Sequence, residues 1–174
     1  ANGYVGRLLT ERLAGALDIV ATDIRLPEDP VDGATHEVLD ITDGAAVAAL
    51  MAQHRPATVV HLAAVVTPRP DQDRAAQHRV DVEGTEHVLA GCVAAGVQKI
   101  VYTSSGAAYG YHPDNPCLLH EDDPLRGNEV FAYAAHKREV EGMLAQYRAD
   151  HPALGQLIFR VSTILGPSVH NQIT

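Results

Sequence analysis

Cysteine is scarce in this sequence, and long apolar runs are missing from it. The 174 residues include two cysteines, Cys92 and Cys117, which form neither a CxxC motif nor the spacing of a metal site. No apolar run approaches the length needed to cross a bilayer. The first residues also lack the basic and apolar regions of a signal peptide. We therefore expect a cytoplasmic protein with reduced thiols and no membrane partner.

Positive charge is scarce as well. The chain has 13 lysines and arginines against 22 aspartates and glutamates, which gives a formal net charge of -9. A diffuse acidic surface repels phosphate backbones, so nucleic acid is not an expected partner. The 10 histidines are scattered without HExxH or HxH pairs, so no metal site is expected either. A length of 174 residues suits a single domain.

The sequence does contain a regular alternation of strand-like and helix-like segments. Strands are expected over residues 18–23, 35–40, 57–64, 97–105 and 155–166. Helices are expected over residues 42–54, 74–95 and 128–150. Thr42 is the candidate N-cap of the first of these helices, and Gly96 is expected to end the second. The alternation predicts an α/β fold, a doubly wound parallel sheet with helices on both faces.

The opening stretch, ANGYVGRLL, indicates a glycine-rich turn that runs into an amphipathic helix. Glycine at positions 3 and 6 would let a pyrophosphate approach the backbone, where the helix N-terminus offers free N–H groups. Such a pair also occurs in ordinary turns. Asp23 ends the next strand, and a carboxylate there can accept hydrogen bonds from the adenosine ribose. Its charge favours NAD over NADP, although the nearby Arg25 could hold a 2′-phosphate.

Two further strand ends carry candidate cofactor contacts. Asp40 could contact an adenine amino group or cap the helix that follows, and the residues alone leave both roles open. Ala63 and Ala64 have small side chains that would let a dinucleotide lie against the backbone. In doubly wound sheets, ligands bind beyond the carboxyl ends of the strands, where these residues are expected.

Tyr133 and Lys137 are four residues apart on an expected helix, so their side chains lie on one face. An ammonium about 4 Å from a phenolate would stabilise it by ~4 kcal/mol at an effective dielectric of about 20. That energy corresponds to ~3 pKa units, which would bring the tyrosine towards neutrality. Tyr133 could then exchange a proton with an alcohol or a carbonyl. Thr103, Ser104 and Ser105 end the preceding strand and offer hydroxyls to the same oxygen.

The ordered segments NGYVG, LDITD, VVHLAA, DVEGTEHVL, KIVYTSSGAAYG, YAAHK and FRVSTILGP resemble the extended short-chain dehydrogenase/reductase family of the NAD-dependent epimerase/dehydratase type. The resemblance spans nearly the whole chain. It implies a cofactor site made of Gly3 and Gly6 at the pyrophosphate, Asp23 at the ribose, Asp40 and Ile41 at the adenine, and Ala63 and Ala64 along the dinucleotide.

The same resemblance implies a catalytic group. In the family pattern the catalytic hydroxyl lies four residues before the tyrosine of a YG pair. Tyr109 follows Ser105 by four, so Ser105 is preferred over Ser104. Tyr133 would be the acid/base. Lys137 would tune it and, together with Tyr133, contact the nicotinamide part of the cofactor.

The chain departs from the family pattern in informative places. Sugar dehydratases carry Asp-Glu directly after the catalytic hydroxyl, where this sequence has Gly106 and Ala107, so a dehydratase is disfavoured. The family's NVxGT appears as DVEGT, with Asp81 in place of asparagine, which puts the usual side-chain role there in doubt.

The pattern also extends beyond this sequence at both ends. The loop's first glycine and the strand before it would precede Ala1, and a substrate domain would follow Thr174. We therefore expect residues 1–174 to be an NAD(P)-binding Rossmann domain, a fragment of a longer chain. Because the missing strand is central in the order 3-2-1-4-5-6, its loss would leave two halves of the sheet unpaired.

These features predict an NAD-dependent oxidoreductase or epimerase. It would transfer hydride at a secondary alcohol carbon of a sugar or nucleotide-sugar-like small molecule. The alternatives are a dehydrogenase or reductase acting on a non-sugar alcohol or ketone (a steroid-like compound or a hydroxy acid), and a non-catalytic dinucleotide-binding regulator. The resemblance further implies a homodimer that packs the helices around residues 74–95 and 128–150 against their mates.

Overall fold

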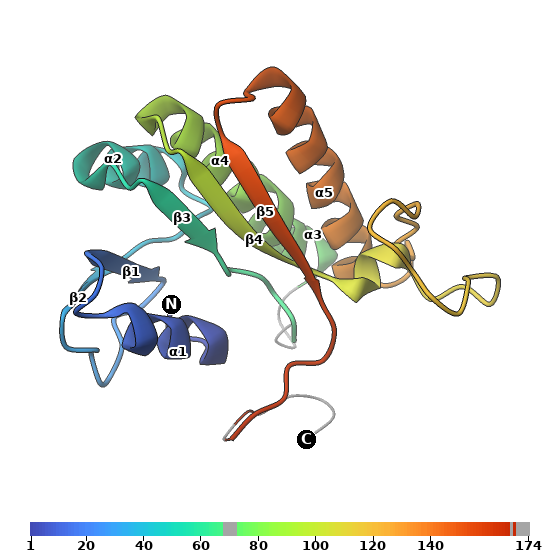
Figure 1. The fold of residues 1–174 in the computed structure, drawn as a ribbon, viewed down its shortest axis with the longest axis horizontal. Coiled ribbons are helices and arrows are strands. Elements are labelled where there is room, and N and C mark those ends of the chain that lie inside the picture. The colour runs from blue at the N-terminus through green and yellow to red at the C-terminus, as the bar shows by residue number, and fades with distance from the viewer. Residues whose placement is uncertain (68–72, 168, 170–174) are drawn as a thin grey trace.

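The computed structural model describes residues 1–67, 73–167 and 169, and its strands form two parallel sheets (Figure 1). In the first sheet, β1 (Ile19–Asp23) pairs with β2 (Ala34–Val38). In the second, β4 (Lys99–Ser105) lies between β3 (Thr58–His61) and β5 (Gly155–Val161). All pairings are parallel, which confirms the expected α/β class.

The two sheets are separate, and no strand of the described residues joins them. The sequence predicted two halves of the sheet that do not pair with each other, and the described residues form two such sheets. The carboxyl ends of β1 and β3 face the same region between the sheets, so the segments that follow these strands border a common space.

The helical elements alternate with the strands. They are α1 (Tyr4–Leu13), α2 (Gly44–His54), α3 (Arg74–His78), the π-helical turn η1 (Arg79–Glu83), α4 (Gly84–Ala95), the 3-10 helix η2 (Gly106–Tyr109) and α5 (Ala132–Asp150). No helix in residues 1–67, 73–167 and 169 has the length and apolar character that crossing a membrane requires.

Helices cover one face of the second sheet rather than both. α2, α4 and α5 pack together on that face, while α1 lies apart from them beside β1 (Figure 1). Leu157 and Phe159 of β5 remain 46% and 48% exposed. The reason lies in the strand order: β3, β4 and β5 follow one another in one direction across the sheet, so right-handed crossovers place their helices on the same face. The β1–β2 connection, residues 24–33, contains no helix.

The core lies between the second sheet and its helices. Its fully buried members include Leu89 of α4, Ile100 of β4 and Leu144 of α5, each 0% exposed. Burial of an aliphatic side chain of this size contributes about 1.5–3 kcal/mol. These three side chains hold α4 and α5 against β4. They thereby fix the position of the polar residues at the end of β4 relative to the two helices.

The helix expected over residues 74–95 is interrupted. Asp73 caps its start by accepting a hydrogen bond from the Ala76 amide at 2.7 Å, and η1 then separates α3 from α4. Gly96 ends α4 with a positive φ of 70°, as the sequence predicted. The π-helical turn was not expected, because a one-residue bulge leaves the apolar pattern on both sides of it intact.

The N-cap of α2 is Asp43 and not Thr42. The Asp43 carboxylate accepts a hydrogen bond from the Ala46 amide at 3.0 Å. The amide and hydroxyl of Thr42 instead donate to the carboxylate of Asp40, at 2.9 and 2.8 Å. The cap therefore moves by one residue, because the Thr42 hydroxyl is already engaged.

Candidate active site

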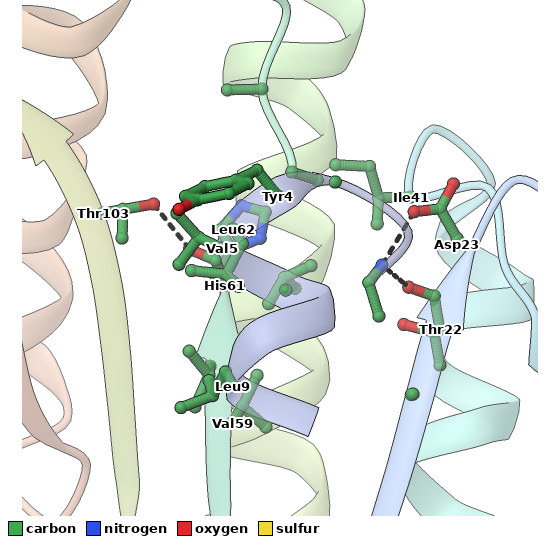
Figure 2. A pocket seen from close by; sticks show the side chains of 18 of the residues that line it. Tyr4, Val5, Leu9, Thr22, Asp23, Ile41, Val59, His61, Leu62 and Thr103 are labelled. Carbon is green, nitrogen blue, oxygen red and sulfur yellow. Dashed lines mark hydrogen bonds and ion pairs between the residues drawn. The ribbon is translucent and has the colours of Figure 1, made fainter. Parts of the chain in front are cut away.

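One cleft of about 2380 Å³ brings together every candidate site residue. It is lined, among others, by Gly3, Gly6, Asp23, Asp40, Ile41, Ala63, Ala64, Ser105, Tyr133 and Lys137. Figure 2 shows part of it, with Leu9 of α1 and Val59 of β3 among the lining residues and with Asp23 at the end of β1. The cleft exceeds the usual 300–1,000 Å³ of a ligand pocket, because it includes the space between the two sheets.

The turn before α1 forms the first wall of the cleft. Gly3 is the N-cap residue, and a Cβ there would have nothing within 4 Å. At Gly6, in contrast, a Cβ would lie 2.6 Å from the Ala1 carbonyl oxygen, so only glycine fits. The first N–H groups of α1 have no partner within the helix, and together with the helix dipole they favour an anion at this end.

Asp23 lies at the end of β1 and holds the start of the chain. Its Oδ2 accepts hydrogen bonds from the Ala1 ammonium at 2.7 Å and from the Asn2 amide at 2.8 Å. Burial alone would raise the pKa of Asp23, but these hydrogen bonds outweigh it, and the pKa lies below its usual value. The carboxylate therefore stays ionised as an acceptor, with residues 1 and 2 on Oδ2 and the Ile24 amide donating to Oδ1 at 2.9 Å.

Asp40 and Ile41 are fixed by local contacts. Because Asp40 binds Thr42 and does not cap α2, the capping role that the sequence left open is excluded. Ile41 packs against Gly84, where a Cβ would lie 2.7 Å from its Cδ1. The Ile41 carbonyl oxygen lies 2.9 Å from His87 Nδ1. The two residues thus form a rigid part of the cleft.

The segment after β3 lies beside these residues. Ala63 is exposed and Ala64 is half-buried, so neither side chain fills the cleft. The Val65 amide donates to Oδ1 of Asp81 at 2.8 Å, which ties this segment to η1. Among the residues that the structure describes, no three His, Cys, Asp or Glu side chains are arranged to hold a metal ion.

The two serines at the end of β4 point to opposite faces of the sheet. Ser104 is 1% exposed, and its hydroxyl donates to Oε1 of Glu141 at 2.5 Å. Ser105 lies on the cleft, where its Oγ accepts a hydrogen bond from the Ala107 amide at 3.1 Å. Alternation along a strand explains the difference. It leaves Ser105 as the hydroxyl of this pair that can reach a ligand.

Tyr133 is the second residue of α5 and borders the cleft beside Ser105. Burial raises the pKa of Tyr133, and a hydrogen bond with Ser105 opposes this only in part. The sequence-based expectation of a lowered pKa is therefore wrong for this structure. Desolvation of a phenolate outweighs any stabilisation because the lysine is not directed at the phenol oxygen.

Lys137 lies one turn further along α5, as predicted, but its ammonium has other partners. Nζ donates to the Tyr102 hydroxyl at 2.9 Å and to the Thr103 carbonyl at 2.8 Å. It lies 5.6 Å from the centre of the Tyr133 ring. Burial lowers the pKa of Lys137 to about 8. Sequence reasoning missed Tyr102, although its alternation with Ile100 along β4 marks it as buried.

Arg160 of β5 anchors the loop that follows η2. It donates to both oxygens of the buried Glu141 at 2.8–3.0 Å, which raises the pKa of the arginine. It also donates to the Tyr109 hydroxyl at 2.6 Å and to the Glu121 carbonyl at 2.8 Å. Tyr109 in turn donates to the His120 carbonyl at 2.8 Å. The loop around residues 120 and 121 is thus fastened to the sheet.

Three aromatic rings lie in a row that ends at the catalytic candidate Tyr133. The ring centres of Tyr111 and Phe131 are 6.2 Å apart, and those of Phe131 and Tyr133 are 5.9 Å apart. Tyr111 and Phe131 are 69% and 44% exposed, and both line the cleft. The Asn128 side chain accepts a hydrogen bond from the Tyr111 amide at 2.7 Å, and this bond holds the backbone of Tyr111 in place. These rings give the cleft an apolar wall next to its hydroxyl groups.

Comparison with known proteins shows the family to which the chain belongs. The model of the NAD dependent epimerase/dehydratase family matches residues 1–174. A UDP-glucose 4-epimerase from Mycolicibacterium smegmatis is 38% identical over 111 residues, which are 63% of this chain and 34% of that protein. An L-arabinose 1-dehydrogenase (NAD(P)(+)) from Haloferax volcanii is 28% identical over 95% of this chain and 65% of that protein.

A solved structure with a similar fold supports the family assignment. MoeE5 in complex with UDP-glucose and NAD superposes with a TM-score of 0.81 at 26% identity, over 98% of this chain and 55% of that one. The chain thus spans roughly a third to two thirds of the length of these relatives.

Proposed function

Since the chain belongs to the NAD dependent epimerase/dehydratase family, we propose that it acts in NAD-dependent hydride transfer at a secondary alcohol carbon of a sugar or nucleotide sugar. One observation carries the proposal: Ser105, Tyr133 and Lys137 line the same cleft as the glycine turn and Asp23. The similarity to a UDP-glucose 4-epimerase and to an L-arabinose 1-dehydrogenase favours this substrate class.

The residues of the cleft fit a dinucleotide. The N-terminus of α1 would hold the pyrophosphate, because its N–H groups are free and Gly3 leaves open space in front of them. Ionised Asp23 would accept the adenosine ribose hydroxyls, and its charge favours NAD over NADP. Asp40 and Ile41 would border the adenine. Bound NAD would supply the hydride acceptor or donor.

The catalytic hydroxyls would act on one substrate oxygen. Ser105 would donate a hydrogen bond to that oxygen and hold it against Tyr133. With its raised pKa, Tyr133 is a phenol at neutral pH, and as such it can donate a proton to a carbonyl oxygen as a C–H bond forms. In the reverse direction the base is the phenolate form of Tyr133, which takes the proton of the substrate hydroxyl as hydride leaves the carbon, and the positive charge of Lys137 would favour that phenolate.

The position after Ser105 argues against elimination chemistry. Gly106 and Ala107 begin η2 and carry no carboxylate, whereas dehydratases of this family carry Asp-Glu there. Epimerisation and simple dehydrogenation both remain compatible with the site. In an epimerase the hydride returns to the same carbon, whereas a dehydrogenase releases reduced cofactor.

A homodimer belongs to the same proposal. In it, α4 and α5 would pack against their mates in the second copy, as the family resemblance implies. Sedimentation velocity would show a species of twice the monomer mass, and a monomer at micromolar concentration would contradict the proposal.

The test uses the protein with NAD and UDP-glucose. Proton NMR would detect an epimer, and absorbance of reduced nicotinamide would detect net oxidation; L-arabinose and glucuronic acid extend the second assay. Tyr133→Phe should lower the rate about 10²–10⁴-fold, the usual contribution of a general acid or base. Tyr111→Phe, which removes a neighbouring hydroxyl, is the matched control. NAD binding without turnover of any sugar would favour the non-catalytic regulator, and wild-type activity in Tyr133→Phe would refute the acid/base role.

A further inference from the structure

The ammonium of Lys137 is held by two acceptors from one strand. Nζ donates to the Tyr102 hydroxyl at 2.9 Å and to the Thr103 carbonyl at 2.8 Å, and both residues belong to β4. Lys137 and Tyr102 are 3% and 2% exposed, so bulk water does not compete for these contacts. Among the residues that the structure describes, the Tyr102 hydroxyl is therefore the one side-chain acceptor of this ammonium.

Two bonded directions fix the third N–H of an ammonium group. Lys137 has one donor beyond the two that bind β4. The lysine lines the cleft, with Nζ 5.6 Å from the centre of the Tyr133 ring. Because the three N–H groups are arranged tetrahedrally about Nζ, rotation about the Cε–Nζ bond would break both hydrogen bonds to β4. The third N–H thus has a set direction before any ligand enters the cleft.

Tyr102 is buried outside the cleft and stays neutral. Its ring lies against that of His61, the residue with which it pairs on β3, with ring centres 5.5 Å apart. Burial raises the pKa of Tyr102, so the phenol keeps its proton at neutral pH. The described residues that line the cleft include Tyr133 and Lys137 but not Tyr102. Tyr102 can therefore hold the ammonium, but it does not touch a ligand in the cleft.

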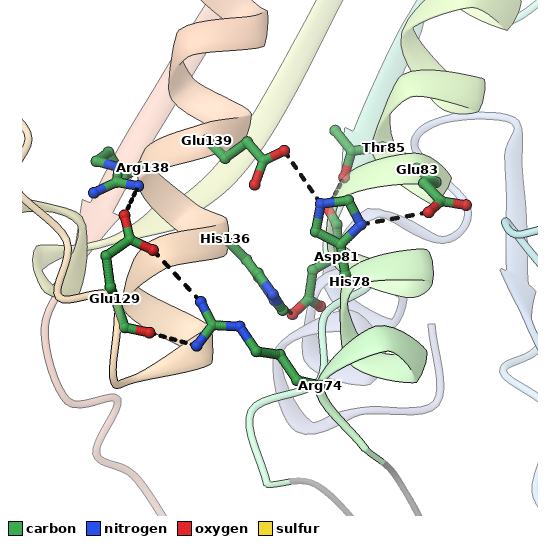
Figure 3. A network of polar contacts seen from close by, with 9 residues as sticks. All are labelled: Arg74, His78, Asp81, Glu83, Thr85, Glu129, His136, Arg138 and Glu139. Carbon is green, nitrogen blue, oxygen red and sulfur yellow. Dashed lines mark hydrogen bonds and ion pairs between the residues drawn. The ribbon is translucent and has the colours of Figure 1, made fainter.

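The helix α5 is held by contacts that do not involve Tyr102 (Figure 3). Nδ1 of His136, the residue before the lysine, lies 3.0 Å from Oδ2 of Asp81 on η1. The residue after the lysine, Arg138, forms an ion pair with Glu129. Loss of the Tyr102 hydroxyl should therefore release the ammonium without moving the backbone that carries it.

We propose that Tyr102 is a positioning residue: its hydroxyl fixes the direction of the third Lys137 N–H, which then meets the cofactor and Tyr133 in a set geometry. The group of the cofactor that suits this donor is a ribose hydroxyl, which accepts a hydrogen bond. The catalytic meaning rests on the proposed function, whereas the holding of the ammonium by Tyr102 does not.

A double-mutant cycle on NAD affinity tests the proposal without a sugar. Tyr102→Phe should weaken NAD binding, measured by calorimetry, about 3–10-fold, the worth of one hydrogen bond. In the Lys137→Met background the same exchange should change Kd by less than about 2-fold, because no ammonium remains to be directed. An equal loss in both backgrounds is what a purely structural role produces, and it overturns the proposal.

A second readout needs neither NAD nor a substrate. The sequence contains two lysines, so ¹⁵N-lysine NMR in mildly acidic solution reports on Lys99 and Lys137 alone, and Lys99→Arg assigns the signals. Tyr102→Phe should shift the Lys137 ammonium signal and speed its hydrogen exchange, while the exposed Lys99 stays unchanged. An unchanged Lys137 signal overturns the proposal.

Other variants guard these measurements against trivial outcomes. Tyr147→Phe removes a hydroxyl from a half-buried tyrosine of α5, and as the matched control it should leave the Lys137 signal and NAD affinity in place. If Tyr102→Phe does not fold, Tyr102→Met removes the same hydroxyl and replaces it in both measurements. If the signal moves and the cycle holds while the unaltered protein turns over no sugar, the proposed function fails and the positioning of Lys137 stands. An unaltered protein that does not bind NAD overturns both.

Discussion

Replacing Arg160 with methionine tests how far the buried carboxylate of Glu141 depends on one cation. The Glu141 side chain is 3% exposed, and Arg160 donates to both of its oxygens. Removal of one partner of a buried ion pair costs about 3–5 kcal/mol. Arg160 is itself 20% exposed, and Ser104 still donates to the carboxylate. We therefore expect the lower end of the range, about 3 kcal/mol.

This cost is large enough for ordinary unfolding experiments. A loss of about 3 kcal/mol lowers the folding equilibrium constant roughly a hundredfold and lowers Tm by about 6–12 °C in a chain of this size. Urea unfolding followed by far-UV circular dichroism measures it directly.

A double variant and a control complete this experiment. Glu141→Leu combined with Arg160→Met removes both charges, so it should be more stable than Arg160→Met alone. Arg148→Met, at an exposed position of α5, should stay within about 0.5 kcal/mol of the unaltered protein. A loss below about 1 kcal/mol for Arg160→Met, or a double variant less stable than the single one, would refute the reasoning.

Three further predictions concern the core and the helices. Leu89→Ala, at a fully buried position, should cost about 2–5 kcal/mol in urea unfolding, and an unchanged midpoint would contradict the core assignment. Gly6→Ala places a Cβ 2.6 Å from the Ala1 carbonyl oxygen, so it should displace the turn and weaken NAD binding measured by calorimetry. Gly142→Ala, where a Cβ meets nothing within 4 Å, should leave NAD binding intact and raise stability by about 0.5–1 kcal/mol.

The parts of the site that depend on local pattern were predictable from the sequence. Tyr133 and Lys137 share a face of α5 because helical spacing alone decides it. Gly96 ends α4 because the left-handed conformation favours glycine. Both serines border the cleft, but the Ser104 hydroxyl donates to the buried Glu141, and strand alternation then directs the Ser105 side chain to the opposite face.

The parts that depend on distant residues were not predictable. The partner of Lys137 is Tyr102, 35 residues away on another element, and only the packing of α5 on β4 reveals it. The raised pKa of Tyr133 follows from the same packing, since burial cannot be read from a spacing of four residues. The contact between His136 and Asp81 joins residues 55 apart in the sequence, so no local pattern predicts it.

The π-helical turn η1 lets the chain hold an extra residue without changing the angular phase of α3 relative to α4. A π turn completes one rotation with one residue more than an α turn. Deleting one residue from Arg79–Glu83 would therefore leave a continuous α-helix with α3 and α4 in phase, but without the wide turn on which Asp81 lies. The hydrogen bonds of Asp81 with Val65 and His136 depend on its place in that turn. A one-residue deletion here should therefore keep the helices folded and disturb the contacts of Asp81, so it separates the helical frame from the site.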